Sequence, residues 1–261
     1  MGGDMSALVR TISKLPGLSK ILGFPNRRMS HLEVAAKLIR LEVSDRDGSG
    51  NFTDLKKRHL DDLVKKNKKI SDSEKNGLQK RIEKSVRIMD KVFHENDPLL
   101  NKQSFPQLYY GWLKDVTSSY ASDDLNTRVR DFLEDFHKRR TENLQKPEEE
   151  RDSVLIEYGL YMQQGTNDRQ SMSRRAEILT RYLLLSNPHF QMVDTDRYFT
   201  DDERFVIWIN GGKRCGKCTK SLKFDEVEAD HVAAWSTGGK TSLENAQALC
   251  GPCNASKGAK K

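Results

Sequence analysis

The sequence predicts a mainly α-helical protein that ends in a small domain of different texture. Apolar side chains recur at helical spacing through the first three quarters of the chain. All four cysteines lie between residues 215 and 253, in two Cys-x-x-Cys pairs. Around those pairs, turns and short strand-like pieces replace the long amphipathic stripes. We therefore expect a helical domain at residues 1–195 and a cysteine-bearing domain at residues 200–261.

Amphipathic stripes predict the helices of the first domain one after another. The expected helices cover residues 31–43, 52–64, 73–93, 104–116 and 123–144, after a short helix or loose arm within residues 1–26.

Capping signals predict three further helices. Lys146-Pro147 followed by three glutamates is typical of a helix start, because proline fits the first turn and carboxylates complement the helix dipole. Ser173 can cap the next helix. Thr200 and Glu203 have the spacing of a capping box, which predicts a short helix over residues 201–209.

Composition narrows the class of protein. The 261 residues carry a net charge of +7, and a basic balance favours polyanionic partners, nucleic acid first. No run of about 18 apolar residues occurs, so we expect no membrane span. Residues 1–26 lack the apolar segment of a secretory signal, which predicts a cytoplasmic protein.

The four cysteines predict a structural zinc site. Cys215 and Cys218 form one pair, and Cys250 and Cys253 form the other, with 31 residues between the pairs. Four thiolates can hold one tetrahedral Zn²⁺ and leave no open coordination position, so this zinc would be structural. A small domain with few large apolar groups gains from such a metal. The alternatives are a disulfide framework or unrelated free thiols, and the paired spacing argues against both.

Four polar residues between and after the cysteine pairs can serve phosphodiester hydrolysis, which needs an activated water and a metal ion. Asp230 is a hard oxygen ligand for such an ion, and the amide oxygen of Asn254 could be a second. A neutral His231 could take a proton from water near physiological pH. Asn245 could hold the backbone of the following loop by hydrogen bonds. Because neighbouring side chains on a strand point to opposite faces, Asp230 and His231 must sit at a strand end or a bulge to share a cleft.

These residues resemble the HNH, or ββα-metal, endonuclease superfamily over about residues 200–261. The spacing is also similar to that of the HNH domain of CRISPR effector nucleases: the two asparagines follow His231 by 14 and 23 positions. The resemblance implies that Asp230 and Asn254 bind a catalytic Mg²⁺ or Mn²⁺, that His231 activates water and that Asn245 braces the loop. It also implies a four-cysteine structural Zn²⁺.

Each assignment has a simpler alternative. His231 could be a buried structural histidine, and Asp230 a turn or capping residue. The whole module could be a catalytically silent zinc-knuckle that binds nucleic acid or protein, or a subunit that is inactive until its complex assembles. The joint pattern of cysteines, Asp-His and asparagines favours an active nuclease.

Basic residues outside this pattern are candidate nucleic-acid contacts. They are Lys240 and Lys257 in the cysteine-bearing domain and Lys56, Lys57 and Arg58 in the helical one. The alternative for the helical cluster is a solvated helix face. Just before it, residues 45–56 begin like a calcium-binding loop, but the last position is Lys56 instead of glutamate, so we expect a turn.

The sequence thus predicts a metal-dependent endonuclease that cuts DNA in preference to RNA. Standalone HNH proteins with an extra helical domain are common in phage restriction and in mobile elements. That context suggests an anti-phage defence or restriction effector. The helical domain would then be a sensor, a DNA-binding part, or a docking site for a protein partner or a second copy.

Overall fold

The computed structural model describes residues 2–46, 52–187, 190–193, 198–235 and 240–258. The chain forms two compact units. The first unit contains residues 1–116 and 129–176, and the second contains residues 117–128 and 177–261. The predicted boundary between residues 195 and 200 rests on the change from amphipathic stripes to turns and cysteine pairs. It stays a prediction.

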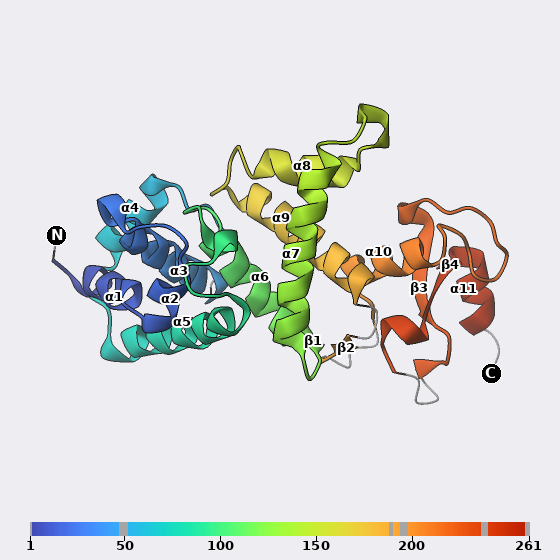
Figure 1. Ribbon diagram of the computed structural model, residues 1–261. Helices are drawn as coiled ribbons and strands as arrows, with labels where there is room; N and C mark the ends of the chain where they lie inside the picture. Colours follow the sequence, from blue (N-terminus) through green and yellow to red (C-terminus); the bar gives the residue numbers. More distant parts are fainter. Residues whose placement is uncertain (1, 47–51, 188–189, 194–197, 236–239, 259–261) are drawn as a thin grey trace. The chain divides into compact units, whose positions relative to one another are not determined.

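Helices build the first unit, as the stripes predicted (Figure 1). In chain order they are α1 (Asp4–Ser13), α2 (Pro16–Ile21), η1 (Arg27–Met29), α3 (Ser30–Arg46), α4 (Lys57–Lys66), α5 (Asp72–Val92), η2 (Pro98–Leu100), α6 (Pro106–Ser119), α7 (Leu125–Asn143), η3 (Glu148–Glu150), α8 (Ser153–Tyr161) and α9 (Arg169–Ser186). Helices α6, α7 and α9 continue from one unit into the other.

The predicted helix starts are wrong in three places. Helix α4 begins at Lys57 instead of 52, because Phe52 and Leu55 are buried in the extended segment before it. Helix α8 begins at Ser153, where the Asp152 carboxylate accepts the N–H of Val154; the three glutamates after Pro147 form only the turn η3.

The third wrong start is that of α9, and the amino terminus also differs from the prediction. Helix α9 already begins at Arg169, so Ser173 is inside it and caps nothing. Residues 1–26, expected as a short helix or a loose arm, contain the two helices α1 and α2, whose apolar side chains are buried.

A buried carboxylate ties three helices of the first unit together. Glu42 on α3 is fully buried and accepts hydrogen bonds from the Tyr110 hydroxyl at 2.7 Å and the Lys114 ammonium at 2.8 Å, both on α6. Arg81 on α5 donates to the other carboxylate oxygen at 3.0 Å. Burying a charge is costly unless it is paired in this way. The buried charge of Glu42 is therefore paired within the first unit.

The second unit ends in the predicted two strands and a helix. Helix α10 (Asp201–Asn210) begins with the predicted capping box between Thr200 and Glu203. After it come η4 (Phe224–Glu226), β3 (Val227–His231), η6 (Leu243–Asn245), β4 (Ala246–Cys250) and α11 (Gly251–Gly258). Strands β3 and β4 pair antiparallel, with Asp230 opposite Gln247 and Val227 opposite Cys250. A second small sheet joins β1 (Tyr120–Ala121) to β2 (Gln191–Met192).

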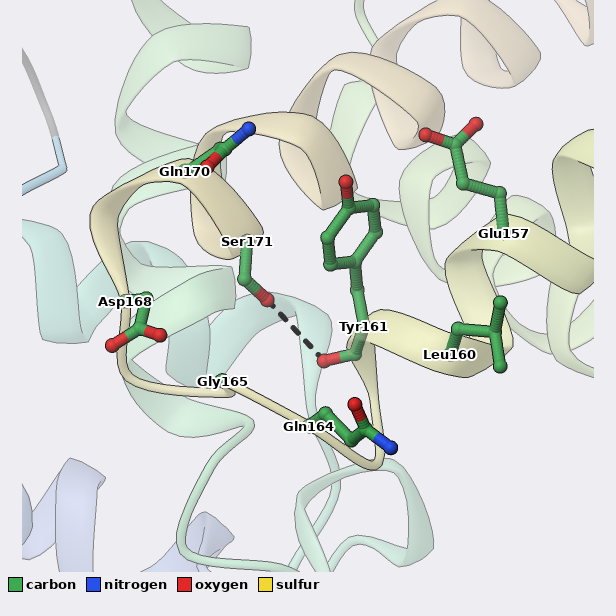
Figure 2. A pocket seen from close by; sticks show the side chains of 8 residues that line it. All are labelled: Glu157, Leu160, Tyr161, Gln164, Gly165, Asp168, Gln170 and Ser171. Atoms are coloured by element: carbon green, nitrogen blue, oxygen red, sulfur yellow. Dashed lines mark hydrogen bonds between the residues drawn. The ribbon is translucent and has the colours of Figure 1, made fainter.

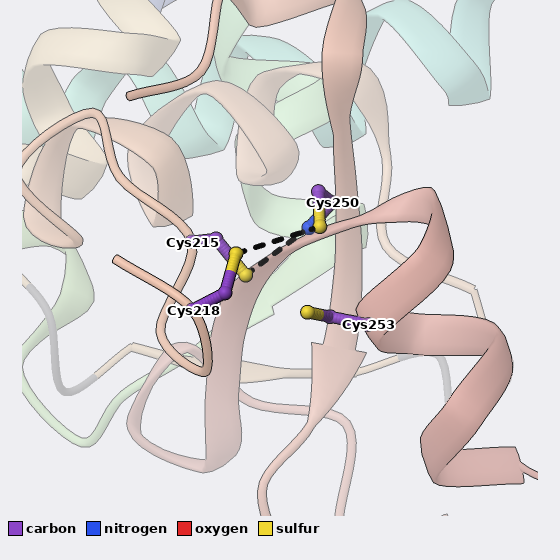
Figure 3. A group of neighbouring side chains, drawn as sticks. All are labelled: Cys215, Cys218, Cys250 and Cys253. Carbon is purple, nitrogen blue, oxygen red and sulfur yellow. Dashed lines mark hydrogen bonds between the residues drawn. The ribbon is translucent and has the colours of Figure 1, made fainter. Parts of the chain in front are cut away.

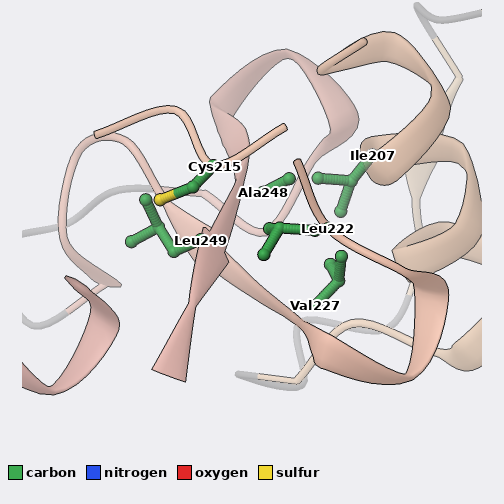
Figure 4. Packing of buried hydrophobic residues seen from close by; sticks show 6 residues of the cluster. All are labelled: Ile207, Cys215, Leu222, Val227, Ala248 and Leu249. Carbon is green, nitrogen blue, oxygen red and sulfur yellow. The ribbon is translucent and has the colours of Figure 1, made fainter. Parts of the chain in front are cut away.

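A small apolar cluster holds α10 against the sheet of β3 and β4 (Figure 4). Its buried members are Ile207, Cys215, Leu222, Val227, Ala248 and Leu249. Trp208 packs at the edge and donates its indole N–H to the Leu222 carbonyl at 2.9 Å. An apolar cluster of six buried side chains is small, which is why a structural metal would matter here. Among the helices of the described residues, none is long and apolar enough to cross a membrane.

Candidate functional site

The four cysteines converge from three segments (Figure 3). Cys215 and Cys218 lie in the loop after α10, Cys250 ends β4, and Cys253 lies in α11. Their sulfur atoms all lie within 4.8 Å of one another, as the ligands of one tetrahedral Zn²⁺ require. The cluster therefore joins the loop, the strand and the helix at one point.

The thiols of this cluster differ in acidity. Burial raises the pKa of the Cys215 thiol, but N–H groups of the two cysteine turns donate to its sulfur and outweigh burial, so its pKa is about 6. Hydrogen bonding with Cys250 raises the pKa of Cys253 to about 12. Thiols so close together cannot all ionise by themselves, whereas zinc binds them as thiolates. The donor set therefore fits a structural zinc ion.

Strand β3 presents two carboxylates to α11. Glu228 and Asp230 are two positions apart, so they share one face of the strand. The Asp230 carboxylate accepts from Lys257 on α11 at 2.6 Å and from Gln247 on β4 at 3.0 Å. The amide nitrogen of Asn254, also on α11, donates to Glu228 at 2.6 Å. The carboxylates of Glu228 and Asp230 are thus paired with the Asn254 amide and the Lys257 ammonium group of α11, and Asp230 also with the Gln247 amide.

His231 is the last residue of β3, so the required strand end is present. Its ring has different neighbours from those of the Asp230 carboxylate. It is 7% exposed and packs on Phe199, with ring centroids 4.8 Å apart. Its Nε2 atom lies 3.0 Å from the Thr241 hydroxyl. A hydroxyl can donate or accept, so Thr241 can fix the ring orientation in either tautomer.

Asn245 holds the loop that follows His231. Its side-chain oxygen accepts from the N–H of Ala233 at 2.8 Å, and its side-chain nitrogen donates to the carbonyls of Ala233 at 3.1 Å and Lys240 at 2.8 Å. Its own carbonyl accepts from Val232 at 2.8 Å. One side chain therefore joins both sides of the loop, the geometry expected of a bracing residue.

Residues 215–260 match the family model described as HNH endonuclease. The chain carries an HNH endonuclease domain at its C-terminal end. No curated protein and no solved structure matched the chain. The matched residues contain the four-cysteine cluster, both strands and α11 of the HNH domain. The predicted C-terminal module and its mainly helical context are thus confirmed.

Lys257, a predicted nucleic-acid contact, lies against the predicted metal ligand Asp230. Besides Asp230, its ammonium group contacts the carbonyl oxygens of His231 and, at 3.3 Å, of Val232. It is therefore a cation inside the HNH domain, bound to the predicted metal ligand. Lys240 is exposed in the loop that Asn245 braces, where a nucleic-acid contact stays a prediction.

The basic cluster of the helical unit is largely paired. Lys56 lies 2.7 Å from Asp168, and Lys57 lies 2.7 Å from Asp61. Arg58 donates to His59 at 3.0 Å. The ion pairs of Lys56 and Lys57 offset part of the positive charge of this cluster, and its contact with nucleic acid stays a prediction. Part of the calcium-like segment, residues 47–51, lies outside the described residues.

The helical unit contains a pocket of about 460 Å³ (Figure 2). Its lining residues are Glu157, Leu160, Tyr161, Gln164, Gly165, Asp168, Gln170 and Ser171. The Ser171 hydroxyl donates to the Tyr161 carbonyl at 3.3 Å. Because its charged lining groups are carboxylates, this pocket does not suit a phosphate, and it plays no part in the proposed site.

Sequence reasoning missed Glu228 and Thr241. Glu228 is spaced two residues from Asp230, which could have placed both on one strand face. Thr241 carried no signal, because its contact with His231 joins residues ten positions apart and no spacing rule marks it.

Proposed function

We propose that the HNH domain hydrolyses phosphodiester bonds in nucleic acid with the help of a divalent metal ion. The observation that carries this proposal is the meeting of Asp230 on β3 with the side chains of α11, next to the cysteine cluster. In our proposal, Asp230 and Asn254 hold the ion, His231 takes a proton from water, and Asn245 keeps the loop in place.

The donor set at Asp230 fits Mg²⁺ or Mn²⁺. Mg²⁺ is usually held by one or two carboxylates, and phosphate and water oxygens fill the rest of its shell. Asp230 supplies a carboxylate that accepts hydrogen bonds from Gln247 and Lys257. When bound, such an ion neutralises charge on the phosphate and on the leaving oxygen.

The chain's own residues would prepare the water and the phosphate. The contacts with Phe199 and Thr241 fix the His231 ring, which limits the directions from which it can reach a water molecule. Lys257 would move from Asp230 to a phosphate oxygen when the metal site fills. The zinc cluster would keep α11 seated on the sheet throughout.

We further propose DNA as the preferred substrate and a defence or restriction role for the whole protein. The helical unit would then act as a sensor, a DNA-binding part or a docking site that decides when the nuclease acts. These proposals rest on the resemblance and on the net charge of +7.

A silent zinc-knuckle binding module is the second candidate. Two observations favour it. The Lys257 ammonium group forms an ion pair with the Asp230 carboxylate, and the His231 ring is almost fully buried. Such a module would bind nucleic acid and cut none.

An activity panel separates the two candidates. Purified full-length protein loaded with zinc would be incubated with single- and double-stranded DNA and RNA, with Mg²⁺, Mn²⁺ or EDTA. We expect cleavage with either metal, greatest on DNA, and none with EDTA or in the Asn254→Ala variant. If the protein binds nucleic acid measurably but leaves every substrate uncut, the result would instead support the silent module.

A further inference from the structure

Glu228 contacts the predicted metal ligand Asn254, although the activity as proposed above assigns it no role. The Asn254 amide nitrogen donates to the Glu228 carboxylate at 2.6 Å. Glu228 is on the same face of β3 as Asp230, two residues earlier. The pair Glu228–Asn254 therefore lies beside the pair Asp230–Lys257, and both pairs join β3 to α11.

The chemistry of this contact decides which end of the amide faces outward. An ionised carboxylate only accepts hydrogen bonds, while an asparagine side chain donates through its nitrogen and accepts through its oxygen. The nitrogen of Asn254 must therefore face Glu228, and its oxygen must point to another side. An oxygen, and not an NH₂ group, is what a hard divalent cation requires.

We infer that Glu228 is a positioning residue, which fixes the amide of Asn254 so that its oxygen is presented to the ion held by Asp230. This inference rests on the proposed function, because it needs the same metal site. Groups that orient a metal ligand without touching the metal commonly change metal affinity 10- to 100-fold when they are removed.

The position of Glu228 is itself constrained. Gly251 is the first residue of α11, and a Cβ added there would lie 3.1 Å from the second carboxylate oxygen of Glu228. The carboxylate thus lies close to the N-terminal turn of the helix, where the helix dipole favours a negative charge. A glycine at 251 allows this approach.

If Glu228 had a purely structural role, its loss would lower the stability of the HNH domain. The Glu228 side chain is exposed, and exposed polar contacts add little to stability. Loss of Glu228 should therefore leave the HNH domain folded while it loosens the amide of Asn254. Metal affinity measured without substrate separates these effects, and it is a readout independent of cleavage.

The experiment is a double-mutant cycle on Mn²⁺ affinity. Full-length protein with its cysteine site filled by zinc would be titrated with Mn²⁺ and followed by electron paramagnetic resonance. The variants are Glu228→Ala, Asn254→Ala and the two combined, with Asp225→Asn as the control for loss of a nearby exposed carboxylate. Zinc content and melting temperature would be recorded for each variant, and Glu228→Leu, which has no acceptor for the Asn254 N–H, replaces Glu228→Ala if the latter loses zinc.

We expect Glu228→Ala to weaken Mn²⁺ binding about 10- to 100-fold and to change it less than about twofold when Asn254 is already alanine. Asp225→Asn should change it less than about twofold. An unchanged affinity in Glu228→Ala would overturn the inference. So would a full loss that persists in the Asn254→Ala background, because Glu228 would then act as a ligand or through charge alone. Wild-type protein that binds no Mn²⁺, or binds it equally well as Asp230→Asn, would instead contradict the proposed function.

Discussion

At the scale of single residues, the Lys257 ammonium competes with any cation for the Asp230 carboxylate. The two groups lie 2.6 Å apart, with side-chain exposures of 33% and 23%. Partly exposed ion pairs of this kind are worth up to about 1 kcal/mol. Lys257→Met should therefore raise Mn²⁺ affinity about two- to fivefold in the same titration, while Lys257→Arg should stay close to wild type. A lower affinity in Lys257→Met would show that Lys257 supports the site instead of competing for it.

Thr241 offers a second test at this scale, because its hydroxyl holds the His231 ring. Thr241→Val keeps the shape of the side chain but removes the hydrogen bond. We expect its cleavage rate to fall about 10- to 100-fold, a part of what a well-placed general base contributes. Mn²⁺ affinity should not change, and Thr241→Ser should restore the rate. Equal rates for Thr241→Val and wild type would mean that this contact does not orient the base.

Those residues of the candidate site that stand at characteristic intervals in the sequence could be predicted. The cysteine pairs, Asp230 and Asn245 could be found in this way, because metal knuckles and tight loops need particular residue types at fixed intervals. The hydrogen-bond partners of Asp230 and Asn254 could not be predicted from the sequence. They depend on how α11 is seated on β3, which no local pattern encodes.

At the scale of elements, the cysteine cluster connects α11 to the rest of the HNH domain. The helix has eight residues and carries both Asn254 and Lys257. A helix this short is unstable alone, so its position must come from its contacts. Cys253 binds it to the cluster from within its first turn.

Cys253→Ser should accordingly remove zinc and the order of α11 together. We expect the purified variant to hold less than one zinc per chain and to be cleaved by trypsin within residues 215–258, while the helical unit resists. Measurement of zinc content and limited proteolysis check this, with Lys220→Ala as the surface control. A variant that retains full zinc and resists trypsin would show that three thiolates are enough.

Helix α7 contains a pH-sensitive contact. Burial lowers the pKa of His137 to about 4, and the ring lies 2.6 Å from the Tyr109 hydroxyl. The unfolded chain binds this proton near its ordinary pKa of about 6.5. Stability is therefore full above about pH 6.5 and falls as the pH drops towards 4, by about 3 kcal/mol.

Urea unfolding of the wild type at pH 7 and pH 4.5 measures this loss, and in His137→Gln the difference should shrink. The same difference in both proteins would assign the pH effect to other groups.

Helices were predicted better than their ends. Apolar stripes located each long helix because burial of one face decides its existence. The ends depend on competition between caps. Helix α8 begins after Asp152 and not after Pro147, because the Asp152 carboxylate accepts hydrogen bonds from the first N–H groups of the helix. Residues 1–26 were underestimated because α1 and α2 are short, and their burial depends on distant helices.

At the scale of the whole molecule, the chain forms two compact units, and each contains its own kind of stabilising contact. Glu42 and its partners connect three helices of the first unit, and the four cysteines, which could hold a zinc ion, lie together in the HNH domain. All residues of the proposed site lie in the second unit, between residues 228 and 257. If HNH chemistry reads backbone more than bases, choice of target must come from the helical unit or from a partner.

The most direct test of the proposed nuclease is relaxation of supercoiled plasmid by the zinc-loaded full-length protein. We expect wild type to nick the plasmid with Mg²⁺ or Mn²⁺, and Asp230→Asn and His231→Ala, prepared identically and with equal zinc content, to be at least about 100-fold slower. The account would be contradicted if wild type left the plasmid supercoiled with both metals. It would also be contradicted if wild type and both variants nicked the plasmid at the same rate.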